Sequence, residues 1–115
     1  MNVKFHLDKN LPLQRLNTNS YNEYCNRIIK IKNYSLSIQG NNQVYSIPKV
    51  NYKNPLLYTH YEVFILDKIS VVIPMAYKEY FDTDGIGRHV PKEIVIKILN
   101  YIKSPICMVM GTDCN

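Results

Sequence analysis

The stretch that decides the fold covers residues 57–73 and reads LYTHYEVFILDKISVVI. Two apolar runs in it stand on either side of the polar pair Asp67 and Lys68. Short apolar runs that are rich in β-branched residues and bounded by a turn are typical of strands buried on both faces. The sequence therefore predicts a hairpin of two central strands, residues 57–66 and 69–73.

Further strands are predicted upstream of this hairpin. Residues 34–38 alternate between apolar and polar side chains, which is the period of a strand with one buried face. Gly40 and the two asparagines after it are a turn signal, and residues 44–47 are predicted to return as the partner strand. The same alternation predicts a short strand at residues 3–7.

Two amphipathic helices are predicted beside the sheet. The first, residues 20–33, begins with a capping box formed by Ser20 and Glu23. Its apolar side chains recur at helical spacing and are Tyr21, Tyr24, Cys25, Ile28 and Ile29. The second begins with Pro91, a residue favoured at the first helical position, and ends before Ser104.

The remaining segments connect these elements. Residues 75–81 are expected to form one helical turn, and residues 82–89 a Gly-rich loop. No repeat or linker divides the chain, and 115 residues are enough to bury one core. The sequence therefore predicts an α+β fold: a small single domain, residues 1–115, with a mostly antiparallel sheet and two main amphipathic helices.

The positive charge lies in the first half of the sequence. Residues 1–54 contain eight Lys or Arg and two Asp or Glu, a net charge of +6, whereas residues 55–115 contain six and seven, a net charge of −1. Such an asymmetry predicts a basic face that binds an anionic partner. No segment is long and apolar enough to cross a bilayer, so no membrane partner is expected.

The cysteines and the N-terminus indicate a compartment. Cys25, Cys107 and Cys114 form no CxxC pair, and three thiols cannot all pair within one chain. The first residues lack the apolar segment of a signal peptide. We therefore expect a cytoplasmic protein with free thiols.

Basic and aromatic residues alternate along the first half of the sequence. Lysines neutralise phosphates, and tyrosine rings stack on unpaired bases. The candidate binding residues are Arg27, Lys30, Lys32, Tyr34, Tyr45, Lys49, Tyr52 and Lys53. They predict a non-catalytic macromolecule-binding protein, in the manner of a phage, virus or mobile-element accessory protein that inhibits a host protein or nucleoprotein complex. One alternative is a protein that binds single-stranded RNA or DNA.

A second alternative is a small nuclease or other hydrolase, because His60 and Glu62 project to the same side of a predicted strand. No nucleophile, phosphate-binding loop or metal cluster accompanies them, so we expect no catalytic residues. The oligomeric state does not follow from the sequence.

One acidic segment resembles the calcium loop of an EF-hand. Counted from Asp82, acidic residues stand at positions one, three and twelve, and Gly87 stands at position six. However, position five is Ile86, whose side chain offers no oxygen ligand. We therefore interpret the segment as a turn before a helix, and expect neither a metal nor a cofactor.

Overall fold

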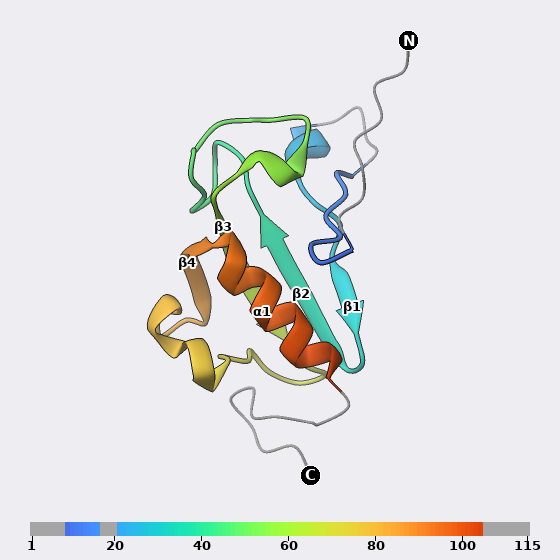
Figure 1. The fold of residues 1–115 in the computed structure, drawn as a ribbon, viewed down its shortest axis with the longest axis vertical. Coiled ribbons are helices and arrows are strands. Elements are labelled where there is room, and N and C mark those ends of the chain that lie inside the picture. Colours follow the sequence, from blue (N-terminus) through green and yellow to red (C-terminus); the bar gives the residue numbers. More distant parts are fainter. Residues whose placement is uncertain (1–8, 17–20, 105–115) are drawn as a thin grey trace.

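The computed structural model describes residues 9–16 and 21–104; the strand predicted at residues 3–7 lies outside them. In the described residues, a four-stranded antiparallel sheet has the order β1-β2-β3-β4, and one α-helix packs against it (Figure 1). The elements are η1 (Tyr21–Tyr24), β1 (Ile29–Ile31), β2 (Tyr34–Gln39), η2 (Pro55–Leu57), β3 (His60–Leu66), η3 (Met75–Tyr80), β4 (Ile86–Pro91) and α1 (Lys92–Lys103), where η marks a short 3-10 helix.

The core lies between the sheet and α1. β2 pairs with β3 so that Leu36 lies opposite Ile65 and Ile38 lies opposite Val63. Because side chains alternate across a strand, these four share one face. The apolar stripe of α1 packs against this face and contributes Val95, Ile98, Leu99 and Ile102 to the core. The predicted antiparallel sheet and the second predicted helix are therefore confirmed. The helix begins at Lys92, however, and Pro91, which the sequence predicts to be its first residue, ends β4.

The helix predicted at residues 20–33 is wrong. Only Tyr21–Tyr24 forms a 3-10 turn, and Ile29–Ile31 is the edge strand β1, which pairs with β2 through a turn at Lys32 and Asn33. β-branched isoleucines favour a pleated strand, and pairing with β2 satisfies the backbone of this segment. The helical spacing of its apolar residues is thus overridden by tertiary pairing.

Three connecting segments also differ from the prediction. Residues 44–47 form no strand; Ile47 alone bridges to His60. Residues 69–73 contribute only a bridge between Val71 and Leu66. The predicted loop at 82–89 is a turn followed by β4, and one Phe81–Gly87 bridge ties the turn to this strand. The helical turn predicted at 75–81 is η3.

The two faces of the sheet differ in burial. The inner face, which α1 covers, carries the buried side chains Leu36, Ile38, Tyr61, Val63, Ile65 and Val90. The outer face carries Lys30, Ser35, Ser37, Gln39, Glu62, Phe64, Leu66 and Ile86, and only Gln39 among them is buried. Of the two faces of the sheet, the outer one is therefore the face that a partner can reach.

Candidate binding site at the bulge of β4

A β-bulge interrupts the pairing of β3 with β4. Tyr61 lies opposite Val90 and Val63 lies opposite Gly87, so that Arg88 and His89 both face the single residue Glu62. His89 has a φ of 51°, in the left-handed region that non-glycine residues rarely adopt. A bulge redirects side chains at a sheet edge, and here it leaves Arg88 and His89 exposed.

The loop between β2 and β3 brings Tyr45 to this bulge. The loop is fixed to the start of β3, because Ile47 N–H donates to the His60 carbonyl (3.1 Å) and Thr59 N–H donates to the Ile47 carbonyl (2.8 Å). His89 N–H donates to the Tyr45 carbonyl (3.1 Å), and Tyr45 N–H donates to Glu62 Oε2 (3.3 Å). The backbone of Tyr45 is therefore held by hydrogen bonds to Glu62 of β3 and to His89 of β4.

Two cations and one imidazole surround the Tyr45 ring. The Arg88 guanidinium carbon lies 4.4 Å from the ring centroid and Lys49 Nζ lies 6.0 Å from it. The His89 ring meets the Tyr45 ring edge-on at 5.7 Å between centroids. We call these four residues, together with Glu62 and Asp82, the Tyr45 cluster.

Asp82 fixes the guanidinium of Arg88. Arg88 Nε donates to Asp82 Oδ2 at 2.8 Å, and the N–H groups of Ile86 and Asp84 donate to Asp82 Oδ1. The Ile86 N–H, followed by that of Asp84 and the Arg88 charge, lowers the pKa of the Asp82 carboxyl below its ordinary value of 3.8. This carboxylate therefore stays charged at neutral pH and holds Arg88 in place.

The terminal nitrogens of Arg88 remain available. Among residues 9–16 and 21–104, none makes a hydrogen bond with its Nη1 or Nη2. A guanidinium that is held by an aromatic ring and by its Nε presents these two N–H groups as a fixed fork, which matches the two oxygens of a carboxylate or phosphate. The cluster is thus suited to bind one planar or tetrahedral anion.

The structure brings Tyr45 and Lys49 together and places the other predicted binding residues elsewhere. Lys30 is exposed on the edge strand β1, whereas Lys32 reaches across to donate from Nζ to the Ser104 carbonyl at the end of α1. Arg27 and Lys53 are exposed. These cations are spread along the molecule rather than gathered around one ring.

The predicted tyrosines Tyr34 and Tyr52 pack against the core. Tyr52 belongs to a polar network in which Tyr58 Oη accepts from Tyr52 N–H (2.9 Å) and from Arg15 Nη2 (3.0 Å). The same Arg15 also donates to the Tyr52 carbonyl and to Asn26 Oδ1. This arginine ties the N-terminal segment to Asn26 and to the loop between β2 and β3, so its contacts are structural.

Arg88 and His89 are the residues that sequence reasoning missed. The glycines on either side of Ile86 are typical of a loop, and nothing in the local pattern predicts a bulge there. His60 and Glu62 interact with separate groups: His60 Nδ1 contacts Thr59 Oγ1 at 2.8 Å, and Glu62 accepts from Tyr45.

The residues that the structure describes contain no group of three or more His, Cys, Asp or Glu side chains placed to hold a metal ion. In the EF-hand-like segment, the oxygens of Asp82 are engaged by the turn and by Arg88. Within the described part of the chain, no helix combines the length and apolar character needed to span a membrane.

No protein-family model, curated protein or solved structure matches this chain.

Proposed function

We propose that this protein is a non-catalytic binding protein, and that the Tyr45 cluster receives a carboxylate of an acidic protein partner. The observation that carries the proposal is the Arg88 guanidinium, which is held over Tyr45 at 4.4 Å and by Asp82 at 2.8 Å while its terminal N–H groups have no hydrogen-bond partner among the described residues. A group already fixed in its binding conformation loses little entropy when the ligand arrives, and this favours affinity.

The charge distribution favours an acidic protein over a nucleic acid. Arg88 and Lys49 are accompanied in the cluster by the carboxylates of Asp82 and Glu62, so its net charge is close to zero. Binding to a phosphate backbone depends on several cations acting together. One oriented arginine beside balanced charges is better matched to a single carboxylate on a folded partner or peptide.

A titration followed by NMR tests this proposal. We expect a hexaglutamate peptide to shift the backbone amide signals of Tyr45, Arg88 and His89 in a saturable way. Arg88→Lys keeps the charge but loses the fork, and should weaken binding at least about tenfold, since a charge-assisted hydrogen bond contributes roughly 1.5–3 kcal/mol. The matched control is Arg27→Lys at an exposed arginine outside the cluster, which should leave binding unchanged.

A ten-residue oligothymidylate measured under the same salt conditions distinguishes the nucleic-acid alternative. Tighter binding of this oligonucleotide, with a steep dependence on salt, would contradict an acidic protein partner. Equal binding of hexaglutamate by Arg88→Lys and the unmodified protein would contradict the assigned site. The sequence-based prediction that the partner is a host protein or nucleoprotein complex, which this protein inhibits, stays a prediction. It would identify the molecule that carries the carboxylate.

A further inference from the structure

A second surface, which borders the Tyr45 cluster at Asp82, is apolar. Four of the eight large apolar side chains that are exposed in the described residues lie between residues 66 and 75, and they are Leu66, Ile69, Val71 and Met75. Ile69 is 92% exposed. A concentration of exposed apolar side chains in one short segment is typical of a protein–protein contact.

Ile69 projects from an ordered turn. Asp67 Oδ1 accepts hydrogen bonds from Ile69 N–H and from Ser70 N–H, both at 2.8 Å, and Asp67 N–H donates to the Ser70 carbonyl at 3.0 Å. The base of the turn is closed by Val72 N–H, which donates to the Ile65 carbonyl at 2.9 Å. The exposed isoleucine is therefore held at the tip of a hydrogen-bonded loop.

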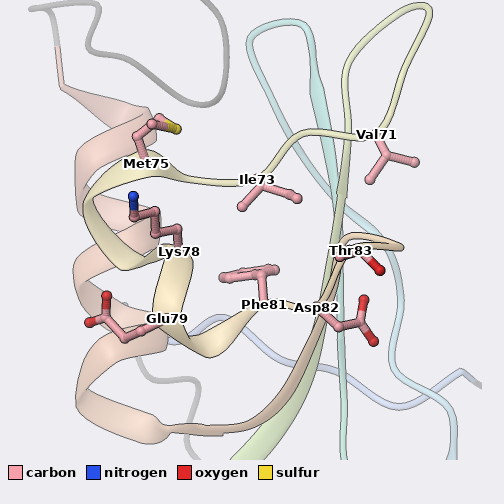
Figure 2. A pocket seen from close by; sticks show the side chains of 8 residues that line it. All are labelled: Val71, Ile73, Met75, Lys78, Glu79, Phe81, Asp82 and Thr83. Atoms are coloured by element: carbon pink, nitrogen blue, oxygen red, sulfur yellow. The ribbon is translucent and has the colours of Figure 1, made fainter.

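A pocket lies beside this loop. Its volume is about 670 Å³, it is open to solvent, and apolar side chains form most of its wall. Figure 2 shows Phe81 and Ile73 between η3 and the segment that carries Val71, with Lys78, Glu79, Asp82 and Thr83 also lining the pocket. The space is large enough to receive an isoleucine side chain, which is the group that the neighbouring loop exposes.

Charges accompany both parts of this surface. Lys68 stands next to Ile69 at the tip of the loop, and Glu79 lines the pocket; both are exposed. In the described part of the chain neither makes an ion pair. The loop thus offers an isoleucine and the cation of Lys68, and the pocket offers an apolar wall bordered by the carboxylate of Glu79 and the ammonium of Lys78.

We infer that this surface binds a second copy of the same chain. In a twofold-symmetric dimer, each copy contributes the same patch, so a patch that holds both a protruding side chain and a matching pocket is self-complementary. Ile69 of each copy enters the pocket of the other, and Lys68 of each copy approaches Glu79 of the other. All of these residues belong to the nearly neutral half of the chain, so two copies meet without the repulsion that two basic halves would impose.

Sedimentation equilibrium tests the dimer. The average mass of the unmodified protein should rise from one chain toward two over a range of roughly 5 to 500 µM. Ile69→Asp puts a charge into the apolar contact and should weaken association at least about tenfold. Because Ile69 is exposed, the Ile69→Asp variant should keep the fold of the unmodified protein, and circular dichroism verifies this. The matched control is Leu57→Asp at an apolar residue that is 56% exposed in η2, and it should associate normally.

A charge exchange tests the geometry. Lys68→Glu and Glu79→Lys should each weaken the dimer, because each creates two like-charge contacts, and the double variant should restore it. A protein that stays monomeric over the whole range, or an Ile69→Asp variant that associates normally, would overturn the dimer. A double variant no stronger than the single ones would overturn the exchange of loops. These variants leave Arg88 and Asp82 unchanged, so the dimer and the binding of hexaglutamate by Arg88 are tested separately.

Discussion

The inner and outer faces of the sheet differ in how deeply their side chains are buried, and the seven residues of β3 show this difference. Tyr61, Val63 and Ile65 point to the inner face and are fully buried under α1. Phe64 and Leu66 point to the outer face, where they are half-buried and 39% exposed, respectively. The alternation of the strand thus separates the side chains that stabilise the fold from those that a partner can contact.

The largest expected effect tests this separation on two adjacent residues. Ile65→Ala should lower the free energy of unfolding by about 2–5 kcal/mol, because it leaves a cavity in the core. Leu66→Ala should lower it by about 1 kcal/mol or less, because that side chain already contacts water in the folded state. Urea denaturation of the two variants measures the difference.

Similar losses for Ile65→Ala and Leu66→Ala would mean that the outer face is covered as well as the inner one. Side chains on that face would then be inaccessible, and the proposed contacts of a partner near it would be contradicted. A larger loss for Leu66 than for Ile65 would contradict the register of β2 with β3, since a shift by one residue exchanges the two faces.

The sequence predicted the parts of the fold that local patterns determine. β2 and α1 follow from the strand period of residues 34–38 and from the apolar stripe after Pro91. β3 follows from the apolar run at Val63 to Leu66, although it begins at His60 rather than at residue 57. In these segments the pattern along the chain and the packing in the fold agree.

The sequence could not predict the parts that depend on contacts between distant segments. β1 forms because β2 offers a pairing partner, and no pattern within residues 20–33 contains that information. The candidate site likewise contains residues that the sequence predicted and residues that it did not. Tyr45 and Lys49 were identified by residue type, whereas Arg88 and His89 join them only through the bulge opposite Glu62.

A smaller effect is expected from the turn that supports Arg88 beside the outer face. The lowered pKa of Asp82 means that the folded protein prefers the carboxylate form. Its contribution to stability is therefore present above the ordinary pKa of about 3.8 and is lost as the pH falls through the lower folded value. Asp82→Asn should lower the melting temperature at neutral pH, and this difference from the unmodified protein should shrink below about pH 4.

Thermal melts from about pH 7 to about pH 3 measure this dependence. The control is Asp84→Asn, which changes a neighbouring carboxylate that makes no ion pair in the described part of the chain. A melting-temperature difference for Asp82→Asn that stays constant with pH would contradict the role of its charge. Weaker hexaglutamate binding by the same variant at neutral pH would support its role in positioning Arg88.

The smallest expected effect distinguishes the observed strand from the helix that the sequence predicts. In that helix, Ile28 and Ile29 would both lie on the buried stripe, and truncating either would be costly. In the structure, Ile28 is 50% exposed, whereas Ile29 of β1 packs against the core. Ile28→Ala should therefore change the free energy of unfolding by only about 0.5 kcal/mol or less, while Ile29→Ala should lower it by about 1–2 kcal/mol. Comparable losses for both variants in urea denaturation would favour the helix, in which both residues belong to the buried stripe.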